Sequence, residues 1–288
     1  MHIVRRRLVG LATAGVAYQA LRTHAEERKQ PHDATNDVDT FEAALPQLRA
    51  VGYTVITNCC PRKSLEECMD TKACASIPTS SASDANAEWR LSSLGRFHRI
   101  AFSEEDEEAF AHLEKTFTPL VESFFRDGEQ GIDSVNADDD HSPPIFRSEL
   151  QLLTAAPQSE HQSWHADNRR RGLTILVPLV DFSVDNGATQ ILPSSHALRP
   201  DSGLGSALRR VLSDGPVIAT PKFGSALAYD ARLYHRGMGN ATAAGRPALV
   251  FRYDRVETPP PGVGVVGAVC QSAAATALHL IASAVSER

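Results

Sequence analysis

Apolar residues recur at helical spacing in two stretches of the first half of the chain. The first stretch runs from residue 39 to 50 and ends at Gly52, and a strand-like segment follows at 53–56. The second runs from residue 104 to 125 and opens on a cluster of acidic residues, as helix N-termini favour. The apolar face of the second comprises Phe110, Leu113, Phe117, Leu120, Val121 and Phe124. The pattern predicts two amphipathic helices and one early strand.

From Ile145 onward the pattern changes to short apolar runs separated by Gly, Pro, Asn and Asp. Many short strands with turn residues between them are typical of a sandwich or barrel. The sequence therefore predicts helices first and then a β-rich catalytic half. The predicted strands are 146–155, 173–180, 187–192, 216–221, 225–229 and 247–255.

Changes in composition divide the chain into three parts. Residues 1–36 form a targeting or flexible segment, 37–258 the catalytic domain, and 259–288 an apolar C-terminal helix. A run of three aspartates before Pro143 separates a helical part, 37–144, from a β-rich core, 145–258.

The two ends raise questions of compartment. Arg5 to Arg7 precede an apolar stretch, and no acidic residue occurs before Glu26, which fits a mitochondrial or plastid targeting peptide, or a signal peptide. A mobile N-terminus of a cytoplasmic protein is the alternative. Residues 262–285 carry no charge and could span a membrane, but their small residues, Gln271 and His279 favour a helix packed on the domain. A membrane anchor stays open.

Composition narrows the class of partner. The 288 residues are 42% hydrophobic and 22% charged, as in an ordinary globular protein, and the net charge of −6 argues against nucleic acid as partner. Four of the five cysteines fall between Cys59 and Cys74, but without the paired spacing of a zinc site. We interpret them as reduced structural thiols.

A candidate metal site begins at His165. On a strand, His165 and Asp167 point to the same face, so both can reach one ion. A third ligand from a distant strand, His235, completes a two-histidine, one-carboxylate triad with open positions, which is typical of iron(II) oxygenases. His161 is an alternative ligand that we interpret as a polar loop residue.

A candidate anion clamp follows the third ligand. Arg246 lies eleven residues after His235, at the start of the last predicted strand, where its guanidinium can grip a carboxylate with two parallel hydrogen bonds. A 2-oxoacid that chelates a metal and carries a second carboxylate requires both groups: the triad for the metal and the arginine for the second carboxylate. Gln162 is a further candidate contact to this co-substrate, with a solvated loop as the alternative.

Three segments together resemble the phytanoyl-CoA dioxygenase family of Fe(II)/2-oxoglutarate-dependent dioxygenases. They are Trp164 to Asp167, Gly187 to His196, and Gly224 to Arg246, within a resemblance that covers about residues 145–256. The resemblance implies an all-β core, a double-stranded β-helix or cupin-like jelly roll, with flanking N-terminal and C-terminal helices, α+β overall. It also implies that the metal lies at the open mouth of this core.

By the same resemblance, the iron ligands are His165, Asp167 and His235, and Arg246 binds the carboxylate of 2-oxoglutarate. His196 matches a turn histidine that is not a ligand. Two positions depart from the pattern: Ser194 replaces a turn glycine, and Gly237 replaces a Ser or Thr. The second departure removes one hydrogen bond to the co-substrate, or leaves it to another residue.

The implied activity is hydroxylation of an unactivated C–H bond in a small-molecule or lipid-like metabolite. Its requirements are Fe(II), 2-oxoglutarate and dioxygen, with ascorbate as reductant in vitro. The carboxylate of Asp167 argues against halogenation, since halogenating relatives carry a small residue there. The run from Arg169 through Arg170 to Arg171 could bind an anionic substrate, or form a solvated loop.

Two other functions remain open from the sequence. A zinc-dependent hydrolase or lyase could use the same three ligands, and a catalytically inactive jelly-roll module could bind a ligand without turnover. The prime substrate and the oligomeric state stay open.

Overall fold

The computed structural model describes residues 37–78, 89–91, 95–126, 144–168, 170–197 and 215–255. Its described strands form two sheets. The larger has eight strands in the order β1-β2-β9-β6-β11-β5-β4-β3, and the smaller has three in the order β10-β7-β8. The larger sheet comprises β1 (Asp37–Val38), β2 (Tyr53–Ile56), β3 (Arg90–Leu91), β4 (Arg96–Arg99), β5 (Phe146–Ala155), β6 (Leu173–Pro178), β9 (Ala226–Asp230) and β11 (Arg246–Asp254). The smaller comprises β7 (Thr189–Ile191), β8 (Val217–Ala219) and β10 (His235–Gly237).

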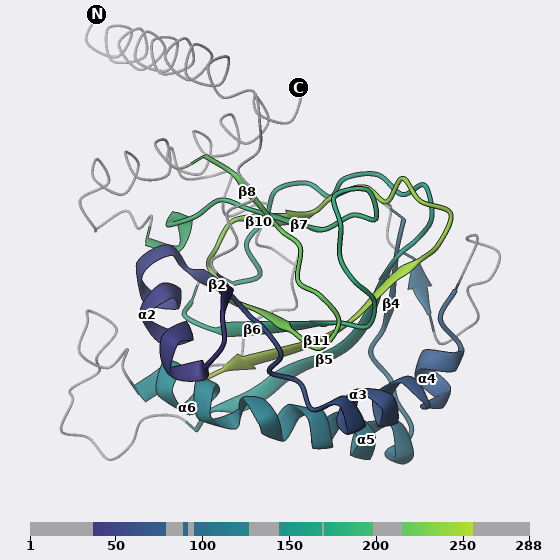
Figure 1. The fold of residues 1–288 in the computed structure, drawn as a ribbon, viewed down its shortest axis with the longest axis horizontal. Helices are drawn as coiled ribbons and strands as arrows, with labels where there is room; N and C mark the ends of the chain where they lie inside the picture. Colours follow the sequence, from purple (N-terminus) through teal and green to yellow (C-terminus); the bar gives the residue numbers. More distant parts are fainter. Residues whose placement is uncertain are drawn as a thin grey trace, which may run out of the picture.

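Helices cover one side of the large sheet and the small sheet faces its other side (Figure 1). The helices are α2 (Phe41–Val51), α3 (Arg62–Met69), α4 (Lys72–Ala75), α5 (Glu104–Glu114) and α6 (Thr118–Arg126), with short 3-10 turns at Lys115–Phe117 and Ser195–Ala197. This β-rich core with helices ahead of it confirms the predicted jelly-roll class. The proposed C-terminal helix lies outside the described residues.

Alternation along the two central strands separates a structural face from a functional one. On β11, Leu249, Phe251 and Tyr253 pack toward the helices, in one apolar core with Phe110, Leu113, Phe117 and Phe124. The intervening residues of β11 face the small sheet, where Ala248 and Val250 join a second apolar cluster. The helix-facing core stabilises the sheet, and the opposite face is left to form a site.

The N-terminal helices begin at well-formed caps. The Thr40 side chain accepts a hydrogen bond from the backbone of Ala43 at the start of α2, and Gly52 ends that helix in the left-handed conformation. Ser103 and Asp106 form a reciprocal capping box at the start of α5. These caps explain why both helices begin close to their predicted starts.

Several predicted elements differ in detail. The single helix expected at 104–125 is divided by the 3-10 turn Lys115–Phe117, because Pro119 has no N–H to donate and cannot continue a regular α-helical ladder. The sequence analysis also missed α3, α4 and the short strands β1, β3, β4 and β10. The strand predictions from 146 to 255 agree with the structure apart from end residues.

The described residues contain no helix long and apolar enough to cross a membrane. The terminal segments 1–36 and 259–288, and the aspartate run before Pro143, lie outside the described residues, so the predictions for them remain predictions. The four cysteines from Cys59 to Cys74 are free thiols, of which Cys60 and Cys68 are buried.

The fold makes a prediction for the core beneath the helices. Phe251 is fully buried, and its ring lies 6.1 Å from that of Phe117. We expect Phe251→Ala to lower the free energy of unfolding by about 3–5 kcal/mol, because the cavity cannot fully collapse. Urea titration followed by circular dichroism measures it. Phe223→Ala, at a side chain that is 38% exposed, serves as control and should change stability by less than about 0.5 kcal/mol. Equal losses in both variants would contradict this assignment of the core.

Candidate metal centre

Backbone pairing brings two distant histidines together. His165 and His235 form an isolated antiparallel bridge, with N–H to carbonyl distances of 3.0 and 2.9 Å. The bridge extends the edge strand β10, whose His235 pairs on its other side with Ile191 of β7. The two imidazole rings consequently lie with their centroids 4.5 Å apart.

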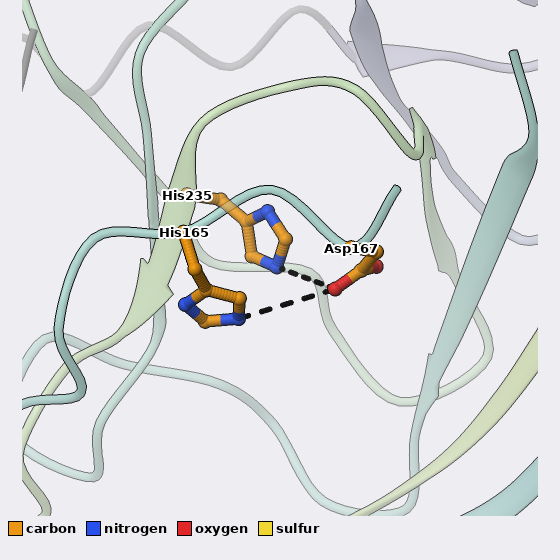
Figure 2. A group of neighbouring side chains, drawn as sticks. All are labelled: His165, Asp167 and His235. Carbon is orange, nitrogen blue, oxygen red and sulfur yellow. Dashed lines mark ion pairs between the residues drawn. The ribbon is translucent and has the colours of Figure 1, made fainter. Parts of the chain in front are cut away.

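Asp167 completes the group, as the sequence predicted. Figure 2 shows both imidazoles directed at its carboxylate, with His165 Nε2 at 3.9 Å and His235 Nε2 at 3.6 Å from Oδ1. One ligand atom from each of the three residues lies within 4.8 Å of the others. It is the one such group of histidine, cysteine and carboxylate side chains within the part of the chain that the structure describes.

Hydrogen bonds to the backbone fix the tautomer of each histidine. His165 Nδ1 lies 2.8 Å from the carbonyl of Ser163, and His235 Nδ1 lies 3.0 Å from the carbonyl of Leu233. A carbonyl can only accept, so Nδ1 carries the proton in both rings and the Nε2 lone pairs point at the shared space.

Two hydroxyl groups orient the carboxylate. Thr174 and Tyr229 donate to Asp167 Oδ2 at 3.0 and 3.1 Å, which leaves Oδ1 toward the imidazoles. Burial and the adjacent carboxylate raise the pKa of Tyr229, so its hydroxyl remains a donor. The sequence analysis missed both residues, although each lies on a predicted strand with its side chain toward the inner face.

Electrostatics favour the protonation states that a metal requires. Burial would raise the pKa of Asp167, but His235 and His165 together lower it below its usual value. Burial lowers the pKa of His235 to about 4, against the opposing effect of Asp167. Near neutral pH the group therefore offers an ionised carboxylate and a neutral buried imidazole, which fit iron(II).

Arg246 is a buried cation that fits an anion. The residue is 2% exposed, and its Nε and Nη1 atoms have no hydrogen-bond partner among the described residues. Its guanidinium lies 4.1 Å above the ring of Phe182. Burial, and then the nearby charge of Arg96, lower its pKa to about 9. An unsatisfied buried guanidinium is costly, and a bound carboxylate would satisfy it.

The other candidate residues lie at the rim or away from the triad. The partly buried Gln162 side chain accepts from the backbone N–H of Gly237 at 2.8 Å, and its contact with a co-substrate remains a prediction. His161 Nδ1 accepts from the N–H of Gly239 and stands outside the metal group. His196 packs at the end of α2, 3.3 Å from the carbonyl of Arg49. The non-ligand interpretations of both histidines agree with these positions.

The arginines that follow Asp167 have different surroundings. Arg170 is exposed, and the Arg171 guanidinium packs over the ring of Phe124 on α6, 4.4 Å from its centroid. Arg169 lies outside the described residues. Anion binding by this run remains a prediction.

A polar wall extends from the metal group across the inner face of the large sheet. In register, Tyr229 pairs with Thr174, Thr174 with Arg252, and Arg252 with Glu149. Arg252 Nη1 lies 3.3 Å from Glu149, whose side chain is 21% exposed. Two positions further along β5, the half-buried Gln151 bonds His98 at 2.7 Å. Within this wall, Glu149 and Gln151 are only partly buried, so solvent reaches it along β5.

Residues 48–248 match the sequence profile of the phytanoyl-CoA dioxygenase (PhyH) family. Among solved structures, the chain is similar to SnoN, described as a non-heme alpha ketoglutarate dependent epimerase from nogalamycin biosynthesis. The identity is 17% and the TM-score 0.55, over 77% of this chain and 86% of SnoN.

Two further structures show the same fold. SnoN in complex with Fe3+, alpha ketoglutarate and nogalamycin RO matches at 16% identity and a TM-score of 0.53, over 78% of this chain and 96% of SnoN. AviO1 from Streptomyces viridochromogenes Tue57 matches at 17% identity and a TM-score of 0.54, over 78% of this chain and 99% of AviO1.

The geometry predicts that Tyr229 supports metal binding. Tyr229→Phe removes one of the two donors to Asp167, so we expect divalent-metal affinity to fall about tenfold. Anaerobic calorimetric titration with Fe(II) or Co(II) measures it. Tyr253→Phe is a matched control, because its hydroxyl donates to Glu114 on the helix-facing side. Unchanged affinity in Tyr229→Phe would exclude this orienting role.

Proposed function

The chain belongs to the phytanoyl-CoA dioxygenase family, and from that premise we propose that it is a non-haem Fe(II)- and 2-oxoglutarate-dependent dioxygenase. We further propose that it hydroxylates an unactivated C–H bond of a small-molecule metabolite. The observation that carries the proposal is the convergence of His165, Asp167 and His235 on one point. The unsatisfied guanidinium of Arg246 adds a binding group for a diacid.

The residues of the chain divide the work of this reaction. His165, Asp167 and His235 would hold iron(II), and Arg246 would bind the distal carboxylate of 2-oxoglutarate through paired N–H groups. With iron, 2-oxoglutarate and dioxygen bound, the site gains the power to oxidise a C–H bond while 2-oxoglutarate is converted to succinate and carbon dioxide. Thr174 and Tyr229 keep the carboxylate ligand fixed during this change.

The polar wall bears on the substrate. Glu149 and Gln151 are half-buried and face the space beside Asp167, where they can accept or donate hydrogen bonds. We therefore place polar groups of the substrate, such as hydroxyl or amine groups, against β5. Glu149 already pairs with Arg252 and Gln151 with His98, but an entirely apolar substrate would desolvate the remaining hydrogen-bonding capacity of both side chains. Among the metabolites considered, this favours a functionalised small molecule over a plain lipid.

Hydroxylation has one alternative outcome with a specific basis. SnoN, which shares the fold, is described as an epimerase. Hydroxylation adds one oxygen atom to the product, whereas epimerisation leaves its mass unchanged. Mass spectrometry of the product from a metabolite screen separates the two.

The proposal predicts 2-oxoglutarate turnover. Purified protein with Fe(II), ascorbate and 2-oxoglutarate should release succinate slowly without a prime substrate, and faster with one. His165→Ala should reduce succinate release by more than about 100-fold, since loss of even an outer supporting group costs 10- to 100-fold. His161→Ala, four residues earlier and outside the metal group, should retain it.

The same assay tests the rival functions. A zinc hydrolase or lyase would release no succinate yet would lose metal with His165→Ala. An inactive binding module would release none under any condition. Absence of succinate from wild-type protein that contains iron would overturn the dioxygenase proposal.

A further inference from the structure

The position two residues after His235 is a glycine because other side chains fill its space. A Cβ atom at Gly237 would lie 2.7 Å from Gln162 Oε1, 3.2 Å from Arg96 Nη2 and 3.4 Å from Arg96 Nε. His235 and Gly237 are two residues apart on β10, so they point to the same face of the strand. The space at Gly237 therefore adjoins the metal group. The Gln162 amide and the Arg96 guanidinium therefore occupy the place where a side chain of residue 237 would project.

Strand register puts Arg96 and Arg246 on either side of one small residue. Arg96 of β4 and Arg246 of β11 are both paired with Ala155 of β5, which lies between them. All three side chains point to the inner face, and the two arginine Cα atoms are separated by two strand spacings, about 10 Å. Only the methyl group of Ala155 stands between them, so two long side chains can meet over it.

The two arginines form a concentrated buried positive charge. Arg96 is fully buried and Arg246 is 2% exposed. Burial lowers the pKa of Arg96 to about 10, and Arg96 contributes to the lowered pKa of Arg246. Two neighbouring cations in a low-dielectric interior repel each other, and an anion between them relieves both the repulsion and the desolvation.

Arg96 is held in place rather than free to swing. Its Nη1 donates to Ser159 Oγ at 2.7 Å and its Nη2 to the carbonyl of Met238 at 2.6 Å. Both acceptors are neutral groups that orient the guanidinium. Met238 directly follows Gly237, and the anchor therefore fixes Arg96 against the strand that carries His235.

We propose that Arg96 is a second carboxylate-binding residue, which together with Arg246 brackets the distal carboxylate of 2-oxoglutarate. Arg96 supplies from β4 the hydrogen bond that the sequence lacks at Gly237. This inference rests on the proposed function, because it assigns a further residue to the same co-substrate. The distal end of the co-substrate then meets two guanidinium groups instead of one guanidinium and one hydroxyl.

Binding of two 2-oxoacids of equal chain length tests the inference without turnover. 2-Oxoglutarate and 2-oxopentanoate have the same chain length, but 2-oxopentanoate ends in a methyl group. Each is titrated anaerobically into Fe(II)-loaded protein by calorimetry. We expect Arg96→Met to weaken 2-oxoglutarate binding about 10- to 100-fold, as loss of a charged hydrogen bond does, and to leave 2-oxopentanoate binding unchanged. Arg96→Lys keeps the charge and should lose less.

Two further variants serve as positive and negative controls. Arg246→Met should show the same selective loss, and Arg90→Met, at an exposed arginine on the neighbouring strand β3, should bind both acids as wild type does. The inference is overturned if Arg96→Met binds 2-oxoglutarate normally. An equal loss of both acids also overturns it, because that pattern indicates a structural role. If Fe(II)-loaded wild-type protein binds no 2-oxoglutarate, the proposed function fails as well.

Discussion

Two reciprocal backbone hydrogen bonds between His165 and His235 determine the geometry of the whole site. They bring together residues from distant parts of the chain and set their side chains on one face. A shift of one residue in this pairing would turn one imidazole to the opposite face. The carbonyls of Ser163 and Leu233 then fix the orientation of each ring. Backbone geometry thus does most of the positioning, and the side chains supply the chemistry.

The large sheet separates stability from function on the same strands. Leu249 and Phe251 of β11 bury apolar surface against the helices, while Arg246 and Arg252 of the same strand face inward. Buried charges are expensive, and a sheet with a charged face needs stabilisation from elsewhere. The apolar helix-facing core provides it. Function can therefore vary on the inner face while the outer face keeps the sheet folded.

Much of this site could be predicted from the sequence because its signals are local. Alternation on a strand predicts that His165 and Asp167 share a face, and the strand that begins at Arg246 has a clear apolar pattern. The strand β10 was missed because three residues give no periodicity. Arg96 could not be found, since β4 is short and its relation to Arg246 exists only through the register of β5. Contacts that depend on register across several strands are invisible in a single sequence.

The three side chains of the candidate metal centre differ in their access to water. The side chains of His235 and Asp167 are 7% and 10% exposed, whereas that of His165 is 24% exposed. His235 and Asp167 are therefore the buried part of the centre, and His165 lies on its solvent side. An ion held by the three residues would therefore exchange with the bulk past His165, so substitutions around His165 would change how long that ion stays bound.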